Sequence, residues 1–198
     1  MSVKPASLLL ACCTALLCMG STLAQPAAEP PPEVLQPYAD PDAYALYATF
    51  MQQRAPGSHV RFVEARTMPL RDCAVRAFGP AGAPIADKIA EAAADSRAAN
   101  ARRLRLTDAF APATPARLLT PAEAQAQLWV DRPDGTDRRP LAVISFSAAG
   151  FSHDRTVAVF RAAFRTGPGG GDITSLVYAR DGAGWREVPG QRQCSAVI

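Results

Sequence analysis

The chain has 198 residues, with 21 lysines and arginines against 18 aspartates and glutamates, and a net charge of +3 at pH 7. This length leaves room for one compact domain, and so small a net charge argues against the strongly basic surface of a nucleic-acid-binding domain. The two histidines, His59 and His153, lie far apart and have no carboxylate cluster at ligand spacing. The sequence therefore predicts neither a metal nor a cofactor.

Residues 1–24 are typical of a secretory signal peptide. Lys4 supplies a positive start, an apolar run follows from Ser7 to Met19, and small residues precede Ala24. The apolar run is shorter than the about 20 residues that span a bilayer. We therefore predict cleavage between Ala24 and Gln25, and export to the periplasm or the medium. The tetrapeptide that ends at Cys12 resembles a bacterial lipidation box, so a lipoprotein anchored at Cys12 is the alternative.

Cleavage of the signal would leave two cysteines, Cys73 and Cys194. Two cysteines in an oxidising compartment most often pair, so we predict a Cys73–Cys194 disulfide. The alternative is a reactive or metal-binding thiol, although the chain contains no C-x-x-C motif.

Residues 25–39 are rich in proline and alanine and predict an extended tether, followed by a single domain over residues 40–198. Asp40 is a good N-cap and Pro41 suits the first helical position, so a helix is expected to begin there and to end by Ala55. Tyr44 and Tyr47 lie on its apolar stripe, where we interpret them as core residues.

The middle of the chain predicts a strand over Val60–Met68 and a helix from Pro84 to about Ala101. Thr120 and Glu123 form a capping box, which predicts the start of a short helix. Between these elements the arginines Arg97, Arg102, Arg103 and Arg105 form the densest basic patch. We interpret this patch as a solvated helix end, with an anionic envelope component, such as a lipid head group or an acidic glycan, as the alternative partner.

The last third of the chain alternates in a strand-like manner over Leu141–Ser147, Thr156–Arg165, Ile173–Arg180 and Gly184–Val188. Short turn sequences separate these segments, which is typical of an antiparallel meander. Because helices precede it, the predicted class is α+β, with the N-terminal helices packed on one face of a C-terminal antiparallel β-meander.

Ser152, His153 and Asp154 are the three residue types of a hydrolase triad, but they are consecutive. Neighbouring side chains in turn or extended backbone point in different directions, so we interpret this tripeptide as a turn and assign no catalytic residue. The glycine-rich run from Gly167 to Gly171 lacks the context of a phosphate loop and predicts a hairpin tip.

The chain from about Tyr44 to Val188 resembles a family of uncharacterised exported bacterial proteins. The residues that carry the resemblance are the Tyr-x-x-Tyr helix at Tyr44–Tyr47, the motif Gly150-Phe151-Ser152, and the Asp-Gly-x-Trp hairpin, here Asp181 to Trp185 with one extra residue. The glycine-rich loop has no cysteines, which some members of that family carry. The resemblance implies export and an α+β fold, and it implies no activity.

These observations favour an exported, non-enzymatic module that binds an envelope or protein partner. The alternative is a periplasmic hydrolase whose site is assembled only in three dimensions. A pocket that gathers two or more of Glu64, Asp87, Asn100 and Asp154 would favour the hydrolase.

Overall fold

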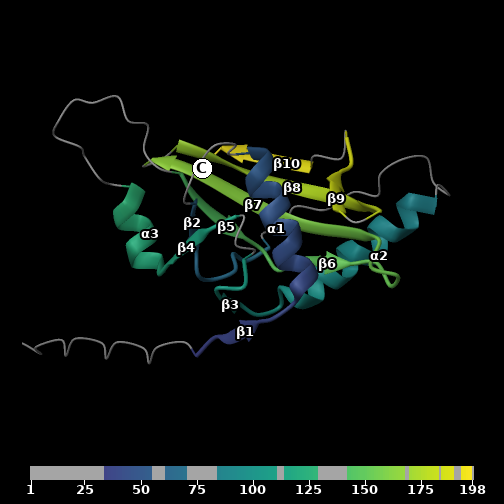
Figure 1. The fold of residues 1–198 in the computed structure, drawn as a ribbon, viewed down its shortest axis with the longest axis horizontal. Coiled ribbons are helices and arrows are strands. Elements are labelled where there is room, and N and C mark those ends of the chain that lie inside the picture. The colour runs from purple at the N-terminus through teal and green to yellow at the C-terminus, as the bar shows by residue number, and fades with distance from the viewer. Residues whose placement is uncertain are drawn as a thin grey trace, which may run out of the picture. The chain divides into compact units, whose positions relative to one another are not determined.

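A computed structural model shows the fold of the chain from Val34 onward (Figure 1). The residues described are 34–54, 61–70, 84–110, 114–128, 142–167, 170–182, 184–189 and 193–197, the last of these for the backbone alone. The signal peptide with its cleavage site, Cys12, His59 and Cys73 lie outside the described residues, as does the side chain of Cys194.

Most of the described strands form one eight-stranded mixed sheet. Its main path runs β10–β8–β7–β5–β2–β4, with β6 paired to β7 and β9 paired to β8. The strands are β2 (Arg61–Glu64), β4 (Ala116–Leu119), β5 (Val143–Phe146), β6 (Gly150–Phe151), β7 (Val157–Gly167), β8 (Gly170–Asp181), β9 (Gly184–Glu187) and β10 (Gln193–Val197). A separate parallel pair joins β1 (Gln36–Tyr38) to β3 (Leu104–Leu106).

The α+β class is confirmed, but the sheet is mixed, so the predicted C-terminal antiparallel meander describes only part of it. Strands β5 to β10 pair in antiparallel fashion, whereas β2 pairs in parallel with both β4 and β5. Parallel neighbours need a crossover connection, which is usually a helix. Helix α2 (Pro84–Ala99) lies between β2 and β4 in the chain, and helix α3 (Pro121–Leu128) lies between β4 and β5. The sheet is therefore mixed.

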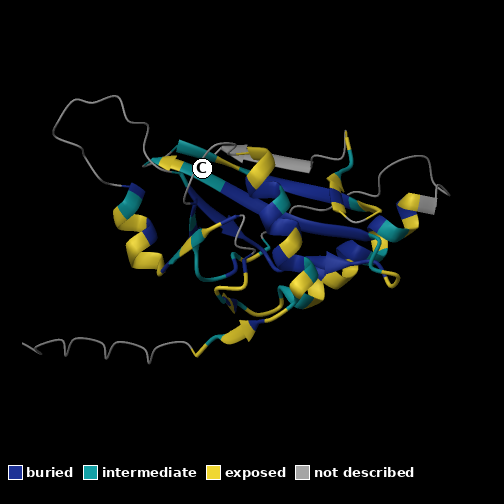
Figure 2. Ribbon diagram, in the orientation of Figure 1, coloured by how far each residue is buried: buried dark blue, intermediate teal, exposed yellow. Residues whose placement is uncertain are grey.

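Helix α1 (Pro41–Arg54) covers one face of this sheet and crosses it in Figure 1. The side chain of Asp40 accepts a hydrogen bond from the backbone N–H of Asp42 at 3.0 Å, as predicted for an N-cap. Tyr47 is fully buried, and its ring stacks on Phe146 with 4.3 Å between ring centroids. The tyrosine stripe is thus part of the core, which appears as the dark band along the sheet in Figure 2.

Helices α2 and α3 pack against side chains of the opposite face. Ile89 and Ala92 of α2 cluster with Val157, Val159 and Val177, and Ala124 and Leu128 of α3 cluster with Leu119 and Val143. Strand neighbours alternate between faces, so these valines point away from the face that carries α1. The prediction that all helices share one face is therefore also wrong. No helix in the described part of the chain is long and apolar enough to cross a membrane.

The ends of the helices agree with the predicted caps. The capping box of α3 is formed, with the N–H of Thr120 donating to the Glu123 carboxylate at 2.7 Å and the N–H of Glu123 donating to the Thr120 hydroxyl at 3.2 Å. Hydrogen bonds from the backbone and from the side chain of Thr120 lower the pKa of the Glu123 carboxyl. Strand β1 lies inside the segment predicted as a tether, and its Tyr38 is buried. Ordered structure therefore begins ahead of Asp40.

Candidate anion-binding pocket

The Ser152–His153–Asp154 segment lies in a turn, and its side chains form no relay. The Ser152 hydroxyl donates to Asp154 at 2.7 Å and accepts a hydrogen bond from the N–H of Val157 at 3.0 Å. The side chain of His153 is 91% exposed, and its nearest ionic partner is Glu91, with Nδ1 at 3.5 Å from Oε2. A relay needs the histidine to contact the serine and the aspartate. Here the histidine points to solvent instead.

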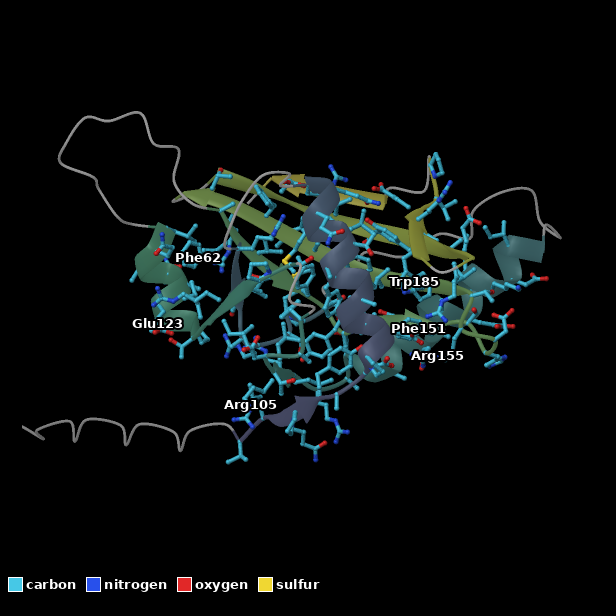
Figure 3. The ribbon with its side chains drawn as sticks, in the orientation of Figure 1. Phe62, Arg105, Glu123, Phe151, Arg155 and Trp185 are labelled. Atoms are coloured by element: carbon cyan, nitrogen blue, oxygen red, sulfur yellow. The ribbon has the colours of Figure 1, made fainter. Side chains whose placement is uncertain are left out.

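A charged cluster holds this turn against the start of α1. Arg155 has a φ of 56° and places its guanidinium on Asp40 and Asp42, each at 2.8 Å. The same guanidinium lies 4.1 Å from the ring centroid of Phe151, and Figure 3 shows Arg155, Phe151 and Trp185 at this end of the sheet. These contacts give the turn a structural role, because they join it to the start of α1.

The other polar residues considered for a hydrolase do not meet. Asp87 is exposed on α2, and Asp154 pairs with Lys88 at 2.7 Å. The side chain of Asn100 exchanges two hydrogen bonds with the backbone of Ala148, at 2.8 and 2.9 Å. Of the four, Glu64 lines a pocket that gathers side chains from three strands, and the other three do not line it.

This pocket lies on the sheet face opposite α1 and has a volume of about 190 Å³. Glu64 of β2, Ser145 of β5 and Arg165 of β7 come from three adjacent strands. Their side chains meet because Ser145 is paired with Ala163, two residues before Arg165 on the same face. The described residues that line the pocket are Glu64, Arg66, Thr67, Met68, Pro69, Arg103, Ser145, Ala163 and Arg165.

The backbone around Arg66 is held on two sides. The N–H of Thr67 donates to Leu104 O at 2.9 Å, and the N–H of Leu104 donates to the Thr67 hydroxyl at 2.9 Å. On the other side the N–H of Met68 donates to Phe146 O at 2.8 Å. These bonds tie the segment after β2 both to β3 and to β5. They bring Arg66 and Arg103 to one pocket. None of these bonds uses the side chain of Arg66 or Arg103.

One carboxylate lies among the three arginines of the described lining. Oε2 of Glu64 accepts hydrogen bonds from the Ser145 hydroxyl at 2.8 Å and from Nη2 of Arg165 at 3.1 Å. Oε1 of Glu64 lies 3.8 Å from Nη2 of Arg66, which is an ion pair but too long for a hydrogen bond. The side chains of Glu64, Arg165 and Arg66 are 14%, 24% and 30% exposed. The pocket thus shields its charges from water only in part.

The donors of the pocket are not all used. Nε of Arg165 is buried and has no hydrogen-bond partner in the described structure. Arginine carries five N–H donors in a rigid planar fork that matches the oxygens of carboxylates and phosphates. With Glu64 taking one bond from Arg165, the three guanidinium groups retain the capacity to bind a further anionic group.

A second pocket, of about 210 Å³, lies on the face of α1 and is lined by Phe50, Arg54, Ala162, Phe164, Asp172 and Thr174. Arg54 is the arginine of its described lining, and that guanidinium already lies over the Phe50 ring at 5.8 Å and 3.9 Å from Glu187. Between the residues that the structure describes, no group of three or more histidine, cysteine, aspartate and glutamate side chains is placed to hold a metal ion.

Comparison of the chain with models of known protein families, with curated proteins and with solved structures found no match.

Sequence reasoning missed most of this pocket. The basic patch is divided by the fold, because Arg97, Arg102 and Arg105 are exposed whereas Arg103 is half-buried and lines the pocket. Arg105 points away from the sheet core in Figure 3. The available signal was Arg165 in a long apolar strand, since a charged side chain at a buried strand position usually has a partner. The sequence does not indicate that this partner is Glu64.

Proposed function

We propose that the protein is an exported, non-enzymatic binding module, and that the pocket around Glu64 binds an anionic group of an envelope or protein partner. The observation that carries this proposal is the convergence of Arg66, Arg103 and Arg165 on a single pocket whose described lining holds one carboxylate. Guanidinium groups in a partly desolvated site bind carboxylates and phosphates by charge-assisted hydrogen bonds, which are about twice as strong as neutral ones.

The size of the pocket favours a group displayed by a larger partner. Pockets that enclose a whole drug-sized ligand measure about 300–1,000 Å³, and this one measures about 190 Å³. A volume of this kind holds one small anionic group. The remaining affinity would come from contacts of the partner with the surface around the pocket.

Export is part of the proposal and is supported by the sequence of residues 1–24. The resemblance to uncharacterised exported bacterial proteins points the same way. Intact-mass measurement of the protein recovered from the periplasm or the medium is expected to give a chain that begins at Gln25. A diacylglycerol adduct on Cys12 would contradict this start and support the lipoprotein alternative.

The hydrolase alternative has less support. A hydrolytic site needs a nucleophile or an activated water beside a general base. Of the polar residues considered for that role, the pocket takes up Glu64 alone, and Glu64 is already bound to Arg165 and Ser145. These two bonds hold the Glu64 carboxylate in place, which favours a binding role for Glu64 over that of a general base.

Binding is tested by titrating the exported protein with inorganic phosphate and with glucuronate, two chemically different anions, and following the titration by calorimetry and NMR. The double variant Arg66→Gln/Arg103→Gln removes two rim charges and leaves the Arg165–Glu64 pair in place. We expect it to weaken binding of the preferred anion by about tenfold or more, because hydrogen bonds to charged groups contribute about 1.5–3 kcal/mol.

The matched control is Arg186→Gln. Arg186 lies on β9, its side chain is 78% exposed, and it pairs with Asp181 instead of lining the pocket. The Arg186→Gln variant should bind the preferred anion as tightly as the wild type does. Failure of the wild-type protein to bind either anion, or an equal loss in the control, would contradict the proposed function.

A further inference from the structure

We infer that the anionic group is an acidic sugar residue, with one carboxylate and neighbouring hydroxyl groups. This inference rests on the proposed function, and it follows from the position of Glu64 inside the pocket. A site made only of arginines would accept any compact anion. A site with a fixed carboxylate selects a ligand that brings hydrogen-bond donors as well as negative charge.

The Glu64 carboxylate is held in place, so we expect it to stay in the pocket when an anion binds. Its Oε2 accepts hydrogen bonds from Ser145 and Arg165, and the Ser145 side chain that donates one of them is itself buried. The parallel pairing of β2 with β4 and β5 fixes the backbone that carries Glu64. Displacing the carboxylate would take this acceptor away from the buried Ser145 hydroxyl and break the bond to Arg165, which is costly. An incoming anion therefore binds beside Glu64.

The second carboxylate oxygen is available to the ligand. In the described structure Oε1 of Glu64 has an ion pair with Arg66 at 3.8 Å, beyond hydrogen-bonding distance, and no hydrogen bond. A ligand hydroxyl placed between these two side chains would accept from the Arg66 guanidinium and donate to Oε1. Hydroxyl groups do both at once, whereas three of the four oxygens of an inorganic phosphate dianion only accept, and a single O–H group is left to donate. A phosphate dianion would in addition be repelled by Glu64.

The rest of the lining suits a sugar ring. Arg103 approaches the pocket from the start of β3 and offers a guanidinium for the ligand carboxylate. Met68, Pro69 and Ala163 supply apolar wall for the C–H groups of the ring. A single uronate residue thus meets a cation for its carboxylate, an acceptor for its hydroxyls and apolar contact for its carbons.

The first test needs no variant. The wild-type exported protein is titrated at pH 8 with glucuronate, with glucose, which has the hydroxyls without the charge, and with inorganic phosphate, which is then a dianion. We expect glucuronate to bind at least about tenfold more tightly than either of the others, the difference made by one charge-assisted hydrogen bond. A glucuronate-containing oligosaccharide is titrated in parallel. Tighter binding of the oligosaccharide supports a glycan chain as the source, and tighter binding of the free acid supports a soluble sugar acid.

The second test removes the acceptor. Glu64→Gln is expected to weaken glucuronate binding by about tenfold, while phosphate binding is unchanged or becomes tighter because a repulsive charge is gone. Glu91→Gln on α2, which loses an equal charge outside the pocket, serves as the control and should bind like the wild type. The melting temperatures of both variants show whether they are folded.

Tighter glucuronate binding by Glu64→Gln would overturn the inference, because Glu64 would then repel the ligand. Phosphate binding more tightly than glucuronate to the wild type would also overturn it, while leaving the proposed anion-binding function in place. If neither anion binds, the proposed function fails as well. The two failures are therefore distinguishable.

Discussion

Gly150 offers the sharpest test of the packing between the sheet and α2. A Cβ atom at this position would lie 2.0 Å from Ser96 N, 2.3 Å from Ala92 O and 2.5 Å from Ser96 Cα, all backbone atoms of the helix. Ordinary contacts between non-bonded atoms are about 3.5 Å, so Gly150→Ala requires β6 or α2 to shift by about 1.5 Å. Overpacking of a core costs about 1–3 kcal/mol. Because backbone cannot rotate out of the way, we expect about 3 kcal/mol.

For a domain of this size each kcal/mol lowers the melting temperature by about 2–4 °C, so Gly150→Ala should melt about 6–12 °C below the wild type by circular dichroism. Gly184→Ala is the matched control. It also adds one methyl group to a glycine of a strand, but nothing lies within 4 Å of the new atom. Its stability should change by no more than about 0.5 kcal/mol. Equal melting temperatures for the two variants would refute the packing argument.

Three further predictions concern single side chains. Tyr47→Phe removes the hydroxyl that donates to Ser147 O at 2.7 Å, and the buried carbonyl left behind should cost about 1–3 kcal/mol in urea denaturation, with the ring packing unchanged. Burial opposes ionisation of Asp42, but hydrogen bonds from Arg155 and Arg180 prevail and lower its pKa. Its contribution to stability is therefore complete above its unfolded pKa of about 3.9 and is lost as the pH falls below that value, so the melting temperature of Asp42→Asn should fall less than that of the wild type on acidification. His153→Ala should change the unfolding free energy by no more than about 0.5 kcal/mol, because the side chain is 91% exposed; a larger loss would show that the turn depends on the histidine.

The helices could be predicted from the sequence because their signals are local. Asp40 and Pro41 mark the start of α1, and Thr120 with Glu123 marks the start of α3, at positions that the structure reproduces. The strands of the last third were found for a similar reason, since alternation over a long hairpin is visible in the chain itself. Each of these signals involves residues within a few positions of one another.

The parallel half of the sheet and the pocket could not be predicted in this way. Strand β4 has four residues and β3 has three, too few for alternation to show. The parallel pairing of β2 depends on where the crossover helices return the chain, and no local pattern records that. Arg66, Arg103 and Arg165 meet only because of these pairings. Because these three arginines lie far apart in the sequence, no local pattern predicts that they line one pocket.

The Cys73–Cys194 disulfide remains a prediction, and the fold sharpens its test. Cys194 belongs to β10, whose backbone pairs with β8 through Gln193 opposite Ser175 and Ala196 opposite Ile173. The C-terminal segment is therefore already held by strand pairing, and a disulfide would add a constraint on the unfolded chain of roughly 4–5 kcal/mol for so long a loop, less any strain. Cys73→Ser and Cys194→Ser should each lower the melting temperature by several degrees, and the double variant should lose no more than either single variant, because one bond can be lost only once. Peptide mapping of the exported protein without reductant should show a single cross-linked pair. Two alkylatable thiols in the native protein, or additive losses in the double variant, would contradict the disulfide and leave Cys73 as a candidate reactive thiol.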